Sequence, residues 1–504
     1  MRITNKIMQN NSLSNINKNK ELEDKLNTQI ATKKKITRPS DDPVVAIRAL
    51  RLRTNLSEIS QYYSKNVPDA KSWLGITEDA IDATSEIISD IYDNCTKGSQ
   101  ASQTATDRLK IIESLKGLRD GVYATGDADC AGRYLFTGYR TDTSLMFGKD
   151  TTVDYSITEK LSAKDVANMT FVDVDNLDKF TESTAVSMGT TEQDISSNQV
   201  HRMRLAYDDC SAGTAPSITY YDTSGTSHTI TAAVASANDV PTPYLTSNWT
   251  PAQQAAGAVF LPETGELILN DTTFAALGAA VDNASTTGVD EGAINVTYHK
   301  SDWQKGDLRP EHYFTCSSGG VNYNPPTSDE DQVISYEVGF SQSLRVNTLA
   351  KDVFDVNIGR DVDEMMKATQ EVVDMENVVK KLEDMLEADP SNTALQERKA
   401  AADKAFDLSK TKMQALFEKQ ITRTQGYLDN SNLALTDVGN RTSKLSLVEN
   451  RLMSQKTSFE KLQSDNENID ITQAAVELSS VELAYEAALM ATGKITQTTL
   501  LNYL

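Results

Sequence analysis

Proline is distributed very unevenly along this chain of 504 residues. Eight of the twelve prolines lie between Pro216 and Pro326, none lies between Pro68 and Pro216, and only Pro390 comes later. Proline lacks a backbone N–H and its ring clashes with the preceding helical turn, so it interrupts helix interiors. The two ends of the chain can therefore form long helices, whereas the middle cannot.

A heptad repeat follows the first prolines. Asp42 ahead of Pro43 has the arrangement of a helix N-cap followed by proline at the first helical position, which predicts a helix start there. Such repeats are typical of helices packed side by side. Pro68 predicts a kink or break within the repeat. The repeat runs in alternating steps of four and three through Val45, Ala49, Leu52, Leu56, Ile59, Tyr63, Asn66, Ala70, Trp73, Thr77, Ala80, Thr84, Ile87 and Ile91.

Two more helices are predicted in the N-terminal part of the chain. One extends from about Thr4 to Thr32, and the other from about Ala101 to Ala124. The apolar residues of the first are only loosely spaced for a helix: Ile7, Leu13, Ile16, Leu22, Leu26 and Ile30.

A second heptad repeat occupies the C-terminal part. Helical patterning returns near Gly359, breaks at residues 388–392 and resumes near Thr393. The polar run SDNENID at residues 464–470 predicts a bend or break. The repeat again alternates steps of three and four, through Leu445, Val448, Leu452, Gln455, Phe459, Leu462, Asn466, Ile469, Gln473, Val476, Ser480, Leu483, Ala487 and Met490.

The last 40 or so residues carry a second apolar stripe beside this repeat, formed by Ala475, Leu478, Val481 and Leu489. A helix that is apolar on more than one side requires more than one partner. We expect the N-terminal helix to be one partner and neighbouring subunits to be the others.

The middle of the chain is rich in Thr, Ser, Asp, Asn and Gly and has short alternating apolar runs. Residues 217–234 look like two strands around an Asp-Thr-Ser-Gly turn, and residues 265–270 and 293–299 also look like strands. The predicted fold class is therefore mainly α with a β-rich insert. Because the two ends share a period, we expect them to pair as a coiled-coil or helical-bundle rod from which the insert projects outward.

Composition limits the classes of function. The net charge of −23 makes nucleic-acid binding improbable on electrostatic grounds. No stretch of 18 uncharged apolar residues occurs, so no membrane insertion is expected. The first residues lack the apolar core of a cleaved signal peptide, although another export route stays open. Residues 1–40 carry an excess of basic residues, which suggests attraction to the acidic remainder within or between chains.

The sequence contains partial motifs for catalysis and metal binding, but each lacks a residue that the motif requires. The four cysteines form no CxxC pair, and the four histidines form no HExxH motif. GFSQS at residues 339–343 lacks the final glycine of a nucleophile elbow, and DVDNLD at residues 173–178 has Leu177 at a calcium-ligand position. We therefore predict no enzyme activity, no catalytic or metal site and no cofactor.

Several segments carry a resemblance to bacterial flagellin-like proteins: MRITNKIMQNN at 1–11, RPSDDPVVAIRALRLRTNLSEISQY at 38–62 and SSVELAYEAALMATGKITQTTLLNYL at 479–504. Residues 132–147 resemble the hairpin that ends the family's first helical domain, and residues 334–354 resemble its return strand. The connector at 38–43 and the ending LLNYL resemble the hook–filament junction proteins of this family. Flagellins proper tend to have an alanine-rich connector and an arginine at or near the end.

The resemblance implies an elongated architecture with an inner helical domain, a second helical domain and a surface insert. The inner domain would comprise 1–37 and 464–504, the second domain 38–147 and 334–463, and the insert 148–333. It further implies a structural adaptor of the extracellular flagellum, exported unfolded through the flagellar secretion channel. Its implied partners are hook-associated protein 1 on the hook side, flagellin on the filament side, further copies in a ring, and a cytosolic chaperone on the C-terminal helix.

Two alternatives remain open from the sequence: a divergent flagellin that builds the filament, and an adhesin carried by the insert. The fold of the insert, its glycosylation and the number of subunits in a ring do not follow from the sequence. The residues predicted to form the packing seam are Leu13, Ile16, Leu22, Leu26, Leu52, Leu56, Ile59, Tyr63, Trp73, Leu445, Val448, Leu452, Phe459, Leu462, Ile469, Val476, Leu483, Met490, Leu501 and Leu504.

Overall fold

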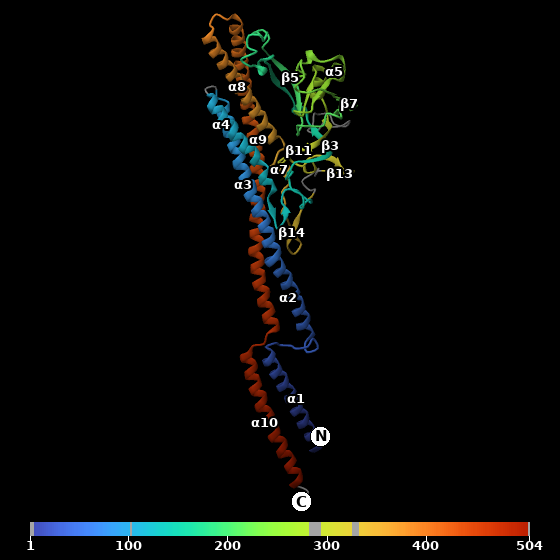
Figure 1. Ribbon diagram of the computed structural model, residues 1–504. Helices are drawn as coiled ribbons and strands as arrows, with labels where there is room; N and C mark the ends of the chain where they lie inside the picture. The colour runs from blue at the N-terminus through green and yellow to red at the C-terminus, as the bar shows by residue number, and fades with distance from the viewer. Residues whose placement is uncertain (1–4, 101–102, 282–293, 325–331, 502–504) are drawn as a thin grey trace. The chain divides into compact units, whose positions relative to one another are not determined.

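The computed structural model describes residues 5–100, 103–281, 294–324 and 332–501. Long helices occupy both ends of the chain and strands occupy the middle (Figure 1). The predicted fold class, mainly α with a β-rich central region, is therefore confirmed. The described residues form two compact units: the first comprises those up to Ala70, Tyr336–Leu344 and those from Ser443 onward, and the second comprises the rest.

The first unit is built from helices of both chain ends and one hairpin. Its elements are α1 (Asn5–Thr32), α2 (Pro43–Gln61), a π-helical turn (Tyr62–Asn66), the last part of α9 (Thr393–Glu467), α10 (Ile471–Leu501), and the hairpin of β14 (Ser335–Gly339) and β15 (Gln342–Arg345). The predicted start of α2 is confirmed: Asp42 Oδ1 accepts from the backbone N–H groups of Val44 and Val45 at 2.9 and 3.1 Å.

Pro68 follows a widened turn rather than a break. The π-helical turn Tyr62–Asn66 directly precedes α3 (Val67–Gly98), and the N–H of Val67 donates to the carbonyl of Tyr62. A π-turn adds room in the helix where the proline ring would otherwise meet a carbonyl one turn earlier. The helical run thus continues past Pro68, and the Asn66 side chain donates to the carbonyl of Glu337 in β14 at 2.7 Å.

The helix predicted to weaken at residues 464–470 breaks there. α9 ends at Glu467 and α10 begins at Ile471. Asp470 caps the new helix, since its Oδ1 accepts from the backbone N–H groups of Thr472 and Gln473 at 2.9 and 3.1 Å. A helix end capped in this way is stabilised by about 1 kcal/mol relative to an uncapped one.

The second unit combines helices with two main sheets. Its helices are the rest of α3 and α9, α4 (Ala105–Val122), α5 (Pro251–Ala256), α6 (Asp271–Gly278), α7 (Ala350–Val353) and α8 (Asn357–Ala388). Fully buried side chains such as Trp73, Ile81, Ile88 and Val362 form its helical core.

The strands of the second unit are short and almost all antiparallel. β1 (Asp129–Cys130) pairs with β2 (Arg133–Tyr134). A six-stranded sheet has the order β13 (Val321–Tyr323), β12 (Thr315–Ser318), β3 (Thr151–Leu161), β11 (Ile294–Trp303), β6 (Ser217–Tyr221) and β7 (Ser227–Thr231). A five-stranded sheet has the order β4 (Val166–Asp173), β5 (Ser196–Arg204), β10 (Glu266–Leu269), β9 (Ala258–Leu261) and β8 (Ala233–Val234). The strands predicted at 217–234, 265–270 and 293–299 correspond to β6 and β7, β10 and β11.

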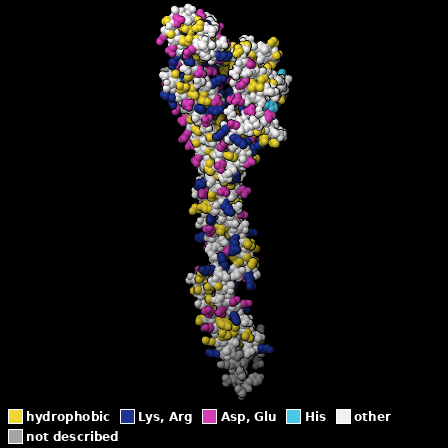
Figure 2. All heavy atoms as spheres, viewed as in Figure 1, with side chains coloured by type: hydrophobic (Ala, Val, Ile, Leu, Met, Phe, Trp, Pro, Cys, Tyr) yellow, Lys and Arg dark blue, Asp and Glu magenta, His cyan; other side chains and the backbone are white. Residues whose placement is uncertain are grey.

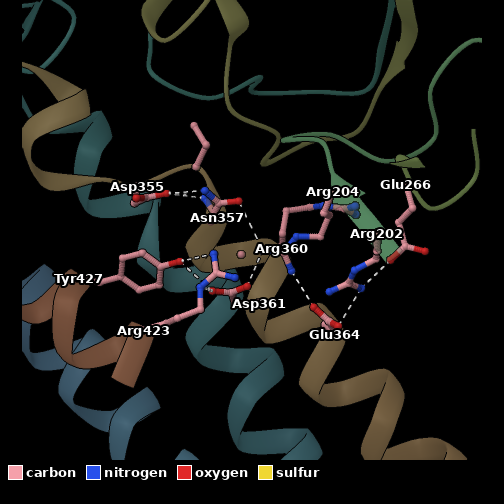
Figure 3. A network of polar contacts seen from close by, with 12 residues as sticks. Arg202, Arg204, Glu266, Asp355, Asn357, Arg360, Asp361, Glu364, Arg423 and Tyr427 are labelled. Carbon is pink, nitrogen blue, oxygen red and sulfur yellow. Dashed lines mark hydrogen bonds and ion pairs between the residues drawn. The ribbon is translucent and has the colours of Figure 1, made fainter. Parts of the chain in front are cut away.

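A buried charge network joins the five-stranded sheet to α8 (Figure 3). Arg202 on β5 lies 2.7 Å from Glu266 and 2.9 Å from Glu364, and Arg204 lies 2.8 Å from Glu364 and 2.5 Å from Asp361. Burial raises the pKa of Glu364, but the charges of Arg202 and Arg204 outweigh burial and lower it to about 2. Separating the two partners of such a pair would leave a buried charge unpaired, which is strongly destabilising. The network therefore favours a single placement of the five-stranded sheet on α8.

Candidate assembly surface

α1 and α10 lie side by side and run in opposite directions (Figure 1). Positions of reduced exposure recur on α1 in steps of three and four: Gln9, Ser12, Ile16, Asn19, Glu23, Leu26 and Ile30. The matching row on α10 is Ala474, Leu478, Val481, Tyr485, Ala488 and Thr492. Four of the seven α1 positions are polar, so the face that α1 presents to α10 is only weakly apolar.

The opposite face of α10 carries larger apolar side chains. Val476, Leu483 and Met490 are 66%, 71% and 70% exposed. They are spaced seven residues apart, and each lies two residues from a packing position, about 200° around the helix. Fully burying a side chain of this size stabilises by about 1.5–3 kcal/mol. This outward row therefore has the character of a contact surface rather than of a solvated helix face.

α1 adds exposed apolar side chains to the same pair, namely Ile7, Met8, Leu13 and Leu22. Hydrophobic side chains are visible on the surface over the two helices (Figure 2). We call the exposed side chains Leu13, Leu22, Val476, Leu483 and Met490 the outward face.

The two predicted apolar stripes of α10 differ in their surroundings within the single chain. Val476, Leu483 and Met490 belong to the predicted seam for helix or subunit packing, and Ala475, Leu478, Val481 and Leu489 form the second stripe. Leu478 and Val481 are partly buried on the side of α1, whereas Ala475, Leu489 and the three seam residues are exposed. Periodicity finds both stripes of a helix but does not decide which partner each stripe meets.

α2 and the end of α9 follow their predicted repeats more closely. Ile59, Leu445 and Leu452 are buried, and Lys456 Nζ lies 5.6 Å from the ring of Tyr63. After Phe459 the inward row of α9 continues at Gln463 and Glu467, so two successive steps are of four residues. Such steps restore the 3.6-residue period of a straight helix. Leu462, assigned to the seam, is consequently 52% exposed.

The predicted seam residues thus fall into four groups. Leu26, Ile59, Trp73, Leu445, Val448 and Leu452 are buried. Ile16, Leu52, Leu56, Tyr63, Phe459 and Ile469 are partly buried. Leu13, Leu22, Leu462, Val476, Leu483 and Met490 are exposed within the single chain. The side chain of Leu501 and all of Leu504 lie outside the described residues.

A buried carboxylate lies between the two helix pairs of the first unit. Glu467, the last residue of α9, is 4% exposed. Arg53 of α2 donates to both of its carboxylate oxygens, at 2.7 Å from Nε and 2.6 Å from Nη2. Lys34 Nζ and Gln463 Nε2 each donate to it at 3.1 Å. These four residues, which we call the Glu467 clamp, connect α2, α9 and the segment that follows α1.

The electrostatics of the clamp favour the ionised carboxylate. The hydrogen bonds from Arg53 are the main cause that lowers the pKa of Glu467 to about 2. Burial opposes them, and the hydrogen bonds from Lys34 and Gln463 add to them. Glu467 is therefore charged at every physiological pH.

Backbone hydrogen bonds reinforce the clamp. The N–H of Lys35 donates to the carbonyl of Glu467 at 2.8 Å, and the N–H of Ile469 donates to the carbonyl of Lys33 at 3.2 Å. The segment between α1 and α2 thus pairs with the segment between α9 and α10 as a very short antiparallel ladder. Sequence reasoning missed Glu467, Lys34 and Arg53, although an acid in a polar helix break and a Lys-Lys-Lys run were the visible signals.

Within the described parts of the chain, no group of three or more His, Cys, Asp or Glu side chains is arranged to hold a metal ion. No described helix is long and apolar enough to cross a membrane.

Comparison with known proteins bears on the N-terminal part of the chain. Residues 3–141 match the model of the bacterial flagellin N-terminal helical region. The N-terminal region of this chain is flagellin-like. The flagellin-like region contains α1, α2, α3 and α4, and so includes one helix of the α1–α10 pair.

Curated relatives of this flagellin-like chain carry the name flagellar hook-associated protein 3. The protein from Salmonella typhimurium is 28% identical over 143 residues, which are 28% of this chain and 45% of the relative. The protein from Escherichia coli is 26% identical over 145 residues, 29% of this chain and 45% of the relative. The chain therefore spans about half the length of the curated relatives that it matches. Its resemblance is to the junction-protein type that the sequence motifs indicated.

A solved structure of flagellar hook-associated protein 3 from Legionella pneumophila is also similar to this flagellin-like chain. The identity is 10%, and the match covers 82% of this chain and 98% of that one with a TM-score of 0.30.

Proposed function

We propose that this chain is a structural adaptor of the bacterial flagellum that joins the hook side to the flagellin filament. Its flagellin-like N-terminal region and its resemblance to hook-associated protein 3 support this role. The mechanism is helix packing rather than catalysis. The partners in this role are hook-associated protein 1, flagellin, and further copies of the chain in a ring.

The observation that carries the proposal is the outward face. Val476, Leu483 and Met490 form one line on α10, directly opposite the side that meets α1. A chain that acts alone gains nothing from this arrangement, because exposed apolar rows of this kind are aggregation liabilities. In a tubular assembly, each row would be covered by helices of neighbouring subunits.

The outward face could also bind the expected export chaperone. Before export, a cytosolic chaperone that binds α10 would cover the same side chains and prevent premature association. Export of the unfolded chain through the flagellar secretion channel would then place the adaptor outside the cell.

A deletion strain tests the proposal. We expect hooks without filaments by electron microscopy and flagellin shed into the medium, with both defects reversed when the gene is restored. Bare hooks without any shed flagellin would identify the chain as the filament subunit instead. Normal filaments would exclude both roles and direct attention to the insert as an adhesin, for which glycan binding by the full chain is the matching assay.

A further inference from the structure

α1 carries two lysines on the side that points away from α10. Lys18 and Lys25 are exposed and spaced seven residues apart. Each lies two residues after a packing position, Ile16 or Glu23, and therefore about 200° around the helix from it. Glu21 lies between the two lysines on the same side, which leaves this side of α1 with a net positive charge.

The outward row of α10 is bordered by acids. Glu477 follows Val476 directly. Glu482 precedes Leu483, and Glu486 follows it by three residues. All three glutamates are exposed, and none of them forms an ion pair in the part of the chain that the structure describes. The same holds for the two lysines of α1, so both helices present unpaired charges of opposite sign.

The short ladder between the helix pairs sets how far each charge lies along its helix. The N–H of Ile469 donates to the carbonyl of Lys33, and α1 and α10 run in opposite directions from this point (Figure 1). Lys25 lies eight residues before Lys33, and Glu477 lies eight residues after Ile469. At a rise of 1.5 Å per residue, both are about 12 Å from the ladder. Lys25 and Glu477 are therefore level with one another.

Lys18 also has acids at its level. It lies 15 residues before Lys33, and the position 15 residues after Ile469 falls midway between Glu482 and Glu486. Within one chain these charges do not meet, because each set points away from the other helix. In a ring whose axis follows the α1–α10 pair, the copies are related by rotation, which leaves every level unchanged. The lysines of one copy are then level with the glutamates of the next.

Contacts between two copies of the same helix fit these charges poorly. A contact of α10 with α10 would bring glutamates together, and a contact of α1 with α1 would bring lysines together. Like charges that face one another across an interface are strongly unfavourable. Such self-complementary contacts also end with two copies, whereas a contact of α1 with α10 continues from copy to copy around a ring.

We propose that neighbouring copies meet through α1 of one copy and the outward row of α10 of the next. The two lysines of α1 pair with the glutamates that border the row. Leu22, which is 44% exposed, covers Leu483, whose level lies within one helical turn of its own. This neighbour contact rests on the proposed function, because it requires copies of the chain that are arranged in a ring.

Cysteine cross-linking in intact flagella tests the neighbour contact. Lys25→Cys and Glu477→Cys are combined in a Cys130→Ser background and produced as the only copy of the chain in the deletion strain. The other three cysteines are buried and stay protected. A short bismaleimide is added before denaturing electrophoresis. Each copy then offers one thiol to each neighbour, so we expect a ladder of covalent dimers, trimers and larger species.

The single-cysteine chains are the matched controls. Lys25→Cys alone and Glu477→Cys alone should stay monomeric, because the proposed contact then brings no two thiols together. Covalent dimers of Glu477→Cys alone would place α10 against α10 and overturn the neighbour contact. A link within one chain of the double variant would overturn it as well, because the two side chains would then face one another without a neighbour.

Charge reversal supplies a second readout. Lys25→Glu should lower the number of filaments per cell by about tenfold, because like charges would face one another across the contact. Glu477→Lys in the same chain should restore that number to within about twofold. Lys20→Glu makes the same charge change at an exposed position on a different side of α1 and should leave filaments normal. A lack of rescue by Glu477→Lys would overturn the pairing.

The deletion strain distinguishes failure of the neighbour contact from failure of the proposed function. If flagella hold the chain at the boundary of hook and filament but yield no ladder, the neighbour contact is wrong and the adaptor role stands. If flagella hold none of the chain, the adaptor role is wrong. The purified full chain is then cross-linked at increasing concentration, and monomers alone would overturn the neighbour contact too.

Discussion

Lys34 and Asn468 lie 434 residues apart in sequence and pair with one another, with Lys34 Nζ 2.7 Å from Asn468 Oδ1. Their backbones also form an antiparallel bridge. The junction of the first unit therefore needs both ends of the chain. A protein that emerges from a channel one end first could not complete this junction until the second end had arrived.

The outward face makes a prediction about assembly. Leu483→Asp places a charge in the middle of an apolar row that partners would bury, so filaments should be absent even though the protein is exported. Because Leu483 is exposed, the free energy of unfolding of the isolated chain should change by less than about 0.5 kcal/mol. Electron microscopy of complemented cells is the measurement. Leu433→Asp, at an exposed leucine of the second unit, is the control, and normal filaments in Leu483→Asp would place the assembly surface elsewhere.

The clamp predicts acid sensitivity of the first unit. The pKa of Glu467 is about 2 in the folded chain, below the ordinary value of 4.5. Its contribution is therefore full above pH 4.5 and is lost as the pH falls toward 2. We expect this contribution to the free energy of unfolding to be about 1–2 kcal/mol, because the side chains of Arg53 and Lys34 are 57% and 41% exposed and solvent screens their charges.

Circular dichroism during acid titration measures this loss. Glu467→Gln should be less stable than the parent at pH 7, and the difference should disappear near pH 2. A constant difference across that range would show that the lost stability does not come from the carboxylate charge.

The insert predicts the opposite pH dependence. Glu159 on β3 is buried, and its carboxylate accepts from the backbone N–H of Ala206 at 3.1 Å and from the hydroxyl of Tyr298 at 3.2 Å. Burial raises its pKa to about 7. The free energy of unfolding should therefore fall as the pH rises from about 5 to 7, by up to about 3 kcal/mol.

Glu159→Gln keeps an oxygen acceptor and removes the charge. It should stabilise the second unit at pH 8 and flatten the pH dependence of its thermal unfolding. If the variant is less stable than the parent at pH 8, the ionised carboxylate of Glu159 is stabilised by interactions that outweigh its burial.

The packing row of α9 predicts a contrast between two leucines ten residues apart. Leu452 is 1% exposed and Leu462 is 52% exposed. Leu452→Ala should lower the free energy of unfolding by about 2–5 kcal/mol, whereas Leu462→Ala should lower it by less than about 1 kcal/mol. Urea titration of the two variants is the measurement. Equal losses would mean that α9 packs through the strict heptad positions, which include Leu462, and not through the row that continues at Gln463 and Glu467.

Much of the helical architecture could be predicted from the sequence, because helix starts and ends depend on residues that are neighbours in the chain. Pro43 after Asp42 determines where α2 begins, and the polar run around Asp470 determines where α9 ends. The prolines between Pro216 and Pro326 exclude long helices from the insert, but strand order in the two sheets depends on contacts between distant segments that no local pattern contains.

The candidate site was predictable in type and not in detail. Apolar stripes on α10 were visible, yet which of Leu478 and Leu483 lies toward α1 depends on how α10 packs against a helix at the other end of the chain. Glu467 could not be recognised from the sequence, because single acidic residues at helix ends are common and its partners Arg53 and Lys34 are distant in the chain. The four boundaries between the five predicted segments remain predictions.

The location of the protein in the flagellum tests the central proposal most directly. An epitope tag in the turn between β6 and β7, at the exposed residues Thr223 and Ser224, would allow immunogold labelling of intact flagella without altering the first unit. The adaptor role predicts one narrow band of gold at the boundary of hook and filament. Gold along the whole filament, or none on the flagellum, would contradict it.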